Sequence, residues 1–545
     1  MIFLTTLLAA VLITISMMPL LRTVAIRCNI AVDLPGERKV HRQAVPRIGG
    51  VTMAFGAFAP LLYWFSSDRF VVFFLAGALL LVVAGFLDDI YDLPPRIKLV
   101  AQVMAALIVI VGGGVQIRSL GTLLPDSVRL TDPVSLPLTL LAIVGATNAI
   151  NLSDGLDGLA GGISMLVFAT IGYIAYLEGS YTIGLISLAL VGVLFGFLRF
   201  NTHPASIFMG DAGSQFLGFS AASLSISLTQ GSPTLSPVLP LLLLGFPILD
   251  TLTVMITRIV QRRSPFRADK NHFHHHLLGL GLHHAESVVV IYVLETFLVL
   301  AAFMLRYFSD WLLLSGYLGF CAIVLMIFGF SRKRGVTLRR FTPFDSRVAA
   351  HLRLLKRNGV MIMKIFPVFV YGIPSLLLMS CVTIDRVPPY LVAPALGAML
   401  LLALPRNFGK PWYGKVLRIV LYLLIPFTVY LDETATAPWF RGVPHSIFSM
   451  LFGIFSVLIL IISKFSRRKS GFKSSPMDFL IIILAVAVPN LPDEHIQEYQ
   501  VGMVAAKIIM LYFSYEVLLA EMRGKYGLIA LSTMAALLVL AFRAM

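Results

Sequence analysis

The sequence predicts an all-α polytopic membrane protein with about eighteen transmembrane helices and its N-terminus outside. Of its 545 residues, 58% are hydrophobic and only 13% are charged, whereas soluble domains are about one quarter charged. Apolar runs of roughly 17–25 residues recur along the whole chain, and each is long enough to cross about 30 Å of hydrocarbon as a helix. The bilayer is therefore the expected solvent.

Charge and cysteine content exclude other classes of protein. In a soluble protein, a net charge of +16 would indicate binding to nucleic acid. Lys and Arg also collect in the cytoplasmic loops of membrane proteins, however. We therefore expect no nucleic-acid partner. The three cysteines are scattered and indicate neither a disulfide framework nor a thiolate metal site. The first apolar stretch, Ile2 to Leu21, lacks a basic start and a small-residue cleavage site, so we expect a retained helix.

The expected helices fall into two blocks. The first block has spans at 3–21, 48–66, 70–87, 97–114, 134–150, 159–177, 181–199, 212–230, 236–257, 287–305 and 311–330. The second has spans at 361–381, 388–404, 416–431, 443–463, 476–489, 500–519 and 526–543. We interpret 1–335 as one membrane domain of about eleven helices, 336–358 as a basic cytoplasmic linker, and 359–545 as an accessory membrane domain of about seven helices.

Basic residues set the orientation. With the N-terminus outside, the inside loops are the ones rich in Lys and Arg: 22–47, 96–98, 258–284, the linker, 406–415, 464–473 and 523–525. The matching outside loops are short or acidic, such as Asp432-Glu433 and Asp493-Glu494, where solvation of a loop is the expected role. This is the charge bias of a cytoplasmic membrane protein.

Unusual polar residues follow four of the spans in the first block. They are Asp88 and Asp89, then Asn151, Asp154 and Asp157, then Asn201 and Asp211, and finally His272, His274, His275 and His276. Under one topology all four groups reach the cytoplasmic surface. Ionisable groups at helix ends near a membrane are costly and tend to be functional.

Each group also has a structural explanation. Asp88 and Asp89 can close a helix, and Asp154 or Asp211 can cap the next one. Six of the eleven histidines lie between His272 and His284, which leaves a zinc site open. No Cys accompanies them, however, and nearby carboxylates suit a hard cation better. Asp oxygens can bind Mg²⁺, with Mn²⁺ as the alternative, and basic groups can bind phosphates. Sites that combine the two are typical of phosphoryl transfer.

Five motifs of the first block, in this order, resemble those of the polyprenyl-phosphate N-acetylhexosamine-1-phosphate transferases (glycosyltransferase family 4). They are Asp33 to His41 with Pro46-Arg-Ile-Gly-Gly50, Gly85 to Asp92 with Lys98, Asn148 to Gly158, Asn201 to Asp211, and Asp269 to His275. The resemblance covers about residues 1–330. The first loop is similar to that of the WecA/TagO branch, which starts common antigen, O-antigen and teichoic acid, more than to that of the phospho-MurNAc-pentapeptide translocase (MraY).

The resemblance implies a role for each group. Asp211, Asp88 and Asp89 would hold the metal, and Asp88 is the favoured base for the polyprenyl phosphate. The residues implied in catalysis are Asp88, Asp89, Asp154, Asp157, His274 and His275. Those implied in substrate binding are Lys98, Asn151, Gly155, Leu156, Asn201, Phe208 and His272. Direct attack by the lipid phosphate and a covalent Asp intermediate both fit, and we favour direct attack.

The expected reaction moves a HexNAc-1-phosphate, by preference GlcNAc-1-phosphate, from a UDP-sugar to undecaprenyl phosphate in the bacterial inner membrane. Another UDP-HexNAc or the muramoyl-pentapeptide donor remains an alternative, as does a lipid-linked glycan transporter without chemistry. Transporter sites usually lie near the bilayer midplane, whereas these groups gather at one face, which favours an enzyme. A homodimer and contacts with downstream glycosyltransferases stay open, and we expect an accessory or glycan-handling role for the second block.

Overall fold

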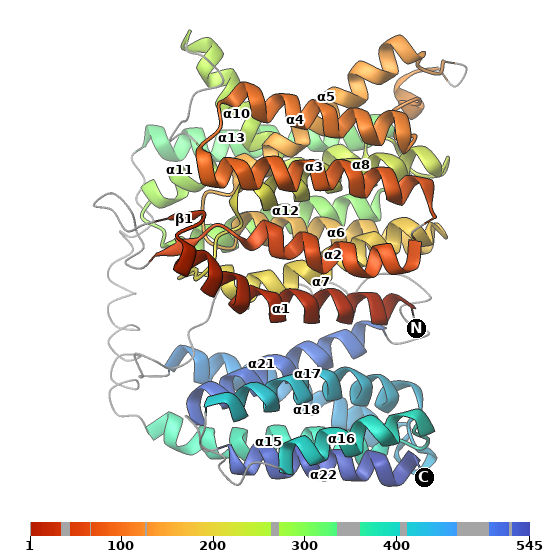
Figure 1. Cartoon of the computed structure of the whole chain (residues 1–545), viewed down its shortest axis with the longest axis vertical. Helices are drawn as coiled ribbons and strands as arrows, with labels where there is room; N and C mark the ends of the chain where they lie inside the picture. The colour runs from red at the N-terminus through yellow and green to blue at the C-terminus, as the bar shows by residue number, and fades with distance from the viewer. Residues whose placement is uncertain are drawn as a thin grey trace. The chain divides into compact units, whose positions relative to one another are not determined.

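The computed structural model describes residues 2–33, 44–65, 67–125, 128–262, 272–334, 360–403, 411–465, 501–522 and 526–544. The chain forms two compact units, Met1–Arg340 and Phe341–Met545 (Figure 1). The described residues form nineteen α-helices and one pair of two-residue strands, so the all-α prediction is confirmed. The expected linker 336–358, the expected span 476–489 and Asp493-Glu494 lie outside the described residues.

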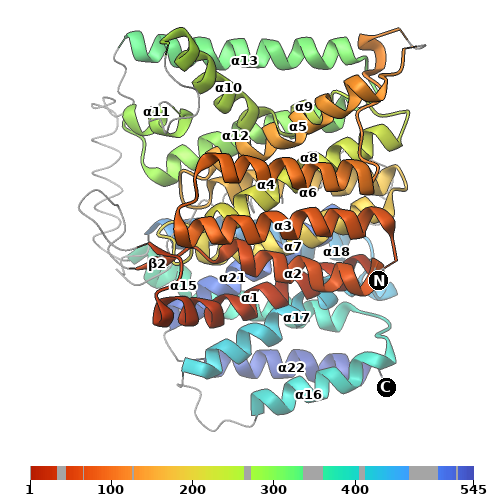
Figure 2. The same ribbon diagram turned by 45° about the horizontal axis from the view of Figure 1, so that its top comes forward.

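Most long helices of the first unit lie side by side (Figure 2). Its helices are α1 (Ile2–Cys28), α2 (Gly49–Phe65), α3 (Arg69–Tyr91), α4 (Pro95–Leu107), α5 (Asp132–Ser153), α6 (Leu159–Leu177), α7 (Tyr181–Asn201), α8 (Gly210–Gly231), α9 (Leu239–Leu243), α10 (Gly245–Val260), α11 (Phe273–Gly279), α12 (His284–Met304) and α13 (Asp310–Lys333). The strands β1 (Val32–Asp33) and β2 (Val45–Pro46) pair antiparallel between α1 and α2.

Helix α8 forms the centre of this unit, packed against α2, α3, α5 and α6. It is rich in Ser, Gly and Ala, and nearly all of its side chains are buried. Small side chains let neighbouring helices approach closely in a membrane protein. The hydroxyl of Ser225 donates to the Ala221 carbonyl at 2.6 Å, and that of Thr229 donates to the Ser225 carbonyl at 3.0 Å. A helix of low hydropathy is thus stable here because protein, rather than lipid, surrounds it.

The span expected at 236–257 is two helices, so that prediction is wrong in detail. α9 ends at Leu243 and α10 begins at Gly245. Pro247 lacks an N–H, and its ring clashes with the carbonyl four residues earlier in a continuous helix. The hydroxyl of Tyr317 donates to the Gly245 carbonyl at 2.9 Å and so satisfies one backbone group at the break.

Ten of the described helices are long and apolar enough to cross a membrane, and the chain is a multi-pass membrane protein. α10 is not among the ten, because the break leaves it with only 16 residues. α8 is also not among them, although the sequence predicts a span at 212–230.

The second unit is a separate helical bundle. Its helices are α15 (Val360–Thr383), α16 (Val392–Ala403), α17 (Pro411–Thr434), α18 (Val443–Phe465), α21 (Val501–Met522) and α22 (Gly527–Ala544). α22 packs against α15 and α16, while α21 packs against α17 and α18. Asp432 and Glu433 lie in the last turn of α17 with buried side chains. The expectation that they solvate a loop is therefore wrong, because packing of α21 against α17 covers them.

Candidate active site

Lys98 joins two of the predicted carboxylates. Its Nζ lies 2.5 Å from Asp88 Oδ2 and 3.1 Å from Asp211 Oδ2. Asp88 lies in the last turn of α3, Lys98 in the first turn of α4, and Asp211 in the first turn of α8. Asp92 adopts φ 52°, and Pro95 is the first residue of α4, so the chain reverses within a few residues and α4 packs back on α3. The short turn therefore places Lys98 beside Asp88.

Asp89 caps α8. Its carboxylate accepts the backbone N–H of Asp211 at 3.1 Å and that of Ala212 at 3.3 Å. The N-terminus of a helix carries unpaired N–H groups and a partial positive charge, so a carboxylate is stable there. Gly210 has φ +71°, and a Cβ at this position would lie 2.3 Å from Asp89 Oδ2. Glycine is required because the carboxylate occupies the space of a side chain.

The Pro46 to Gly50 motif holds the segment before Asp211. Phe208 N–H donates to the Pro46 carbonyl at 2.9 Å, and the Gly49 N–H donates to the Phe208 carbonyl at 3.0 Å. A Cβ on Gly50 would lie 2.1 Å from the backbone nitrogen of Gly213. The glycines thus allow α2 to touch the backbone of α8, and they fix partly buried Phe208 next to the metal-ligand candidate.

Asn151 lies in the last turn of α5, and Asp154 follows the end of that helix. The Ser214 hydroxyl donates to Asn151 Oδ1 at 2.6 Å. Burial, together with the nearby charges of Asp211 and Asp157, raises the pKa of the Asp154 carboxyl from its ordinary 3.8 to about 7, although the charge of Arg47 opposes the shift. Arg47 is a functional candidate that the sequence reasoning missed, although it lies within the quoted Pro46 to Gly50 motif.

Asp157 and Asn201 form hydrogen bonds between the α5–α6 and α7–α8 loops rather than with the carboxylates around Lys98. Asp157 Oδ2 lies 2.8 Å from His203 Nδ1 and accepts the Ala205 N–H at 3.1 Å. Burial alone would raise the pKa of Asp157, but these hydrogen bonds lower it below its ordinary value. Asn201 Oδ1 accepts the Gly158 N–H at 2.9 Å. The predicted catalytic and donor-binding roles stay predictions, and the contacts seen here tie the α5–α6 loop to the α7–α8 loop.

His284 completes this contact, because its Nε2 accepts the Asp157 N–H at 3.1 Å and its ring stacks on His203 at 4.3 Å. Ligand atoms of Asp157, His203 and His284 lie within 4.8 Å of one another. His203 bonds the carboxylate of Asp157 and His284 bonds its backbone N–H, so these residues connect the two loops. His203 and His284 were not among the predicted site residues.

Asp250 of α10 fixes the histidine segment. Its carboxylate pairs with His272 Nδ1 at 2.9 Å and accepts the Phe273 N–H at 2.8 Å. The sequence reasoning missed Asp250, and the signal was a lone acidic residue inside an apolar stretch. His272 is therefore held by α10 rather than by the carboxylates at α8.

His274 connects the histidine segment to the α5–α6 loop. A Cβ on Gly155 would lie 2.4 Å from the imidazole of His274, so glycine is needed for this ring to pack there, and Leu156 beside it is buried. Burial and, to a smaller extent, the neighbouring His275 lower the pKa of His274 to about 4. His274 is thus a neutral ring at neutral pH, whereas His275 is exposed, with its ring 4.2 Å away.

The structure therefore brings Asp88, Asp89, Lys98 and Asp211 into direct contact. Asp154 is close enough for the charge of Asp211 to raise its pKa, and Asn151 joins the group through Ser214. Three or more carboxylates with one bound lysine can hold a hard cation and an anionic phosphate ester. This arrangement suits phosphoryl transfer at the helix ends of a membrane protein.

Comparison with known proteins agrees with this chemistry. Residues 71–229 match glycosyl transferase family 4. A Bacillus subtilis (strain 168) protein described as a probable undecaprenyl-phosphate N-acetylglucosaminyl 1-phosphate transferase is 38% identical over 361 residues, 65% of this chain and 97% of the relative. Undecaprenyl-phosphate alpha-N-acetylglucosaminyl 1-phosphate transferases of Salmonella typhi (30% over 351 residues, 62% of this chain and 92% of the relative) and Yersinia pestis (29% over 328 residues, 59% and 88%) are also similar.

Proposed function

The chain belongs to glycosyl transferase family 4, and we propose that it transfers GlcNAc-1-phosphate from UDP-GlcNAc to undecaprenyl phosphate. The products are UMP and undecaprenyl-diphosphate-GlcNAc, the first lipid-linked intermediate of a surface glycan. The single observation that carries this proposal is the position of Lys98 between Asp88 and Asp211, at the junction of α3, α4 and α8.

A divalent cation fits this group of residues. Asp88 and Asp211 share one ammonium group, Lys98, and the carboxylate of Asp89 binds the backbone N–H of Asp211, so the carboxylates of this partly buried site outnumber the lysine. Asp211 and Asp88 would hold Mg²⁺, or Mn²⁺, and Asp89 would support them from the N-terminus of α8. When bound, such a cation neutralises the diphosphate and favours departure of UMP.

The chain's own groups bind and orient the two substrates. Lys98 holds the phosphate of undecaprenyl phosphate, and Asp88 takes its remaining proton. The lipid phosphate oxygen then attacks the β-phosphorus of UDP-GlcNAc, the bond to the bridging oxygen breaks, and that oxygen leaves with UMP. No covalent Asp intermediate is needed, because the acceptor is already an anionic nucleophile. Positioning and electrostatics supply most of the rate.

On this proposal the α5–α6 loop and the histidine segment bind the donor nucleotide sugar. Asn151, Gly155, Leu156 and Phe208 would shape its site, with Asp154, Asp157 and Asn201 fixing the loops around it. Phe208 offers a ring face for uracil, and neutral His274, with His272 and His275, would contact the diphosphate. The bond from Asp250 holds His272 in place, and the packing on Gly155 holds His274. These groups are thus oriented before the substrate binds.

The charge bias of the loops supports a cytoplasmic site in a chain with its N-terminus outside and about eighteen spans. On this proposal 1–335 is the transferase domain, 336–358 the cytoplasmic linker and 359–545 an accessory membrane domain. The described helices support the first of these assignments most directly, because every contact of the site lies within Met1–Arg340.

The deciding experiment is UMP release by the purified full-length protein with undecaprenyl phosphate, UDP-GlcNAc and Mg²⁺. We expect release that needs the lipid and stops with EDTA. Asp211→Asn should reduce it at least about a hundredfold. The matched control is Asp132→Asn, an exposed carboxylate paired with Arg118, which should retain the full rate. Release without lipid, or full activity of Asp211→Asn, would contradict the proposal.

A further inference from the structure

One face of α12 carries three polar side chains that bond to other segments of the first unit. They are His284, Tyr292 and Glu295, and their spacing places them on the same side of a helix. Helix α12 packs against α6, α10 and α11. Tyr292 and Glu295 are fully buried. An ionisable group such as Glu295 inside a membrane helix is costly and tends to be functional.

Tyr292 holds the loop between α5 and α6. Its hydroxyl donates to the Gly158 carbonyl at 2.6 Å, one residue after Asp157, whose N–H donates to His284 Nε2 at 3.1 Å. A Cβ on Gly162 would lie 2.0 Å from the Tyr292 hydroxyl, so a side chain at this position would displace the ring. Two hydrogen bonds therefore join α12 to the α5–α6 loop.

Glu295 holds the start of α10. Its Oε2 accepts the Phe246 N–H at 3.3 Å. The N–H of a residue in the first turn of a helix has no acceptor in its own helix, and inside a membrane protein it needs one from elsewhere. Glu295 Oε1 has no hydrogen-bond partner among the described residues. The bond to Phe246 is thus the interaction that explains a buried carboxyl at this position.

Helix α10 links Glu295 to the histidine segment, residues 272–276. Phe246 and Asp250 lie about one turn apart on α10. The Phe246 ring packs against the Phe273 ring, with 5.6 Å between their centres, and Asp250 bonds both His272 and the Phe273 N–H. The residue that Glu295 holds therefore contacts the histidine segment itself, and the next turn of the same helix bonds that segment twice.

We propose that Tyr292 and Glu295 are positioning residues for the donor, and that α12 sets the distance between the α5–α6 loop and the histidine segment without touching the substrate. The inference rests on the proposed function, in which these two segments bind UDP-GlcNAc. They are far apart in the chain, so their separation depends on the helix that contacts both. A displacement of about 1 Å caused by a change far from the reacting atoms can reduce activity about a hundredfold.

The test is UMP release by purified full-length variants, with UDP-GlcNAc and undecaprenyl phosphate varied in turn. Glu295→Ala should raise KM for UDP-GlcNAc about tenfold and leave KM for undecaprenyl phosphate within about twofold of wild type. Glu295→Gln should keep KM for UDP-GlcNAc within about threefold, because its amide oxygen can accept the same N–H. Tyr292→Phe, which loses only a hydroxyl, should raise that KM about fivefold.

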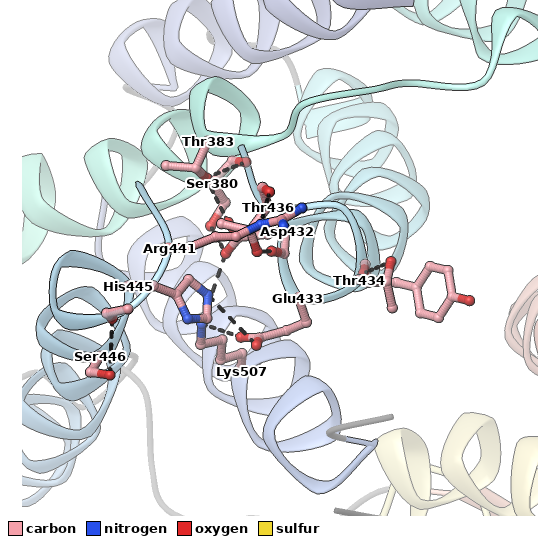
Figure 3. A network of polar contacts seen from close by, with 12 residues as sticks. Ser380, Thr383, Asp432, Glu433, Thr434, Thr436, Arg441, His445, Ser446 and Lys507 are labelled. Atoms are coloured by element: carbon pink, nitrogen blue, oxygen red, sulfur yellow. Dashed lines mark hydrogen bonds and ion pairs between the residues drawn. The ribbon is translucent and has the colours of Figure 1, made fainter. Parts of the chain in front are cut away.

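This readout separates positioning from stability. Partial unfolding leaves fewer active molecules, which lowers kcat but does not change KM. Asp310→Ala is the matched control, because Asp310 is a buried carboxylate that accepts the Thr122 N–H at 2.6 Å. It should lower the melting temperature without changing either KM. Asp432→Asn, at a buried carboxylate of the second unit that accepts the Thr383 hydroxyl (Figure 3), should leave UMP release unchanged.

A double-mutant cycle tests the route through α10. Asp250→Ala should raise the same KM, and Glu295→Ala/Asp250→Ala should raise it little further, because both changes release the same segment. Fully multiplied effects would overturn the route from Glu295 through α10.

The wild-type protein and the two mild variants decide the remaining outcomes. If wild type releases UMP but KM for UDP-GlcNAc is unchanged in both Glu295→Ala and Tyr292→Phe, the proposed role of α12 is wrong. A Glu295→Gln protein as impaired as Glu295→Ala would contradict a role for the Phe246 hydrogen bond. No release by wild type would overturn the proposed function and this inference with it.

Discussion

Lys98 bridges two carboxylates that come from helices far apart in the sequence. The turn at Asp92 brings it to Asp88, and the packing of α3 on α8 brings both to Asp211. A single side chain thus holds together the groups that the metal and the lipid phosphate would meet.

Lys98→Met should reduce UMP release at least about a hundredfold, because it removes the positive charge that holds the acceptor phosphate. Initial rates across a range of undecaprenyl phosphate concentrations measure this loss. Arg96→Gln, an exposed cation two residues away, is the control and should stay within about twofold of wild type because it lies on the surface. If the Lys98→Met protein kept more than half of the wild-type rate, Lys98 would not be needed for the reaction.

Asp154 should make stability depend on pH. Its pKa is about 7 in the folded chain and 3.8 ordinarily, so between these values the folded protein keeps a proton that the unfolded chain has lost. Stability therefore falls as pH rises through this window and stays lower above it. Asp154→Asn should raise the melting temperature relative to wild type at pH 8 but not at pH 4, in thermal unfolding without added metal. The same gain at both pH values would show that the carboxyl does not titrate in this way.

At the scale of helices, contact between backbones determines where the site forms. Gly50 on α2 and Gly213 on α8 touch without side chains between them, and the contact fixes the start of α8, where Asp89 and Asp211 meet. Small residues at such crossings are the usual means of close helix packing in membranes.

Gly50→Ala should destabilise the protein, because the new Cβ would lie 2.1 Å from a backbone atom that cannot move aside. Overpacking of this kind costs about 1–3 kcal/mol or more, so the melting temperature in detergent should fall and activity with it. Gly145→Ala is the matched control on α5, where a Cβ meets nothing within 4 Å. There the change should be neutral or slightly stabilising, since Ala is the better helix former. Equal effects of the two substitutions would contradict the packing described here.

At the scale of the whole molecule, the site contacts described above join residues of the first unit, and the relatives named above align with 59–65% of the chain. The proposed transferase activity is thus separable from the second unit. It uses carboxylates at the ends of α3, α5 and α8 and histidines at the start of α11.

A chain ended at Gly335 should therefore release UMP within about twofold of the full-length rate, because it keeps every residue that contacts the transferase site. The measurement is the same release assay on protein that elutes as a single species in size-exclusion chromatography. Loss of activity in such a folded, truncated protein would mean that the second unit contributes to catalysis.

The sequence by itself determined the class of the protein, its family and its reaction. The hydropathy and length of the helices require a membrane. The comparisons confirm the family. The family could be recognised because the motifs around Asp88, Asp154 and Asp211 are short sequence patterns that are readable without knowledge of the packing. The helix break at Pro247 was also readable, although we predicted one span there. Local rules govern these features, since each depends on residues adjacent in the chain.

Only the tertiary structure decided which charges meet. Asp250 supports His272, Asp157 pairs with His203, and Lys507 pairs with Glu433, and each pair joins segments that no local pattern relates. Asp432 and Glu433 follow an apolar stretch and look like a solvated loop, yet they are buried. Burial depends on which helix packs across a helix end, and that choice belongs to the bundle as a whole rather than to the residues themselves.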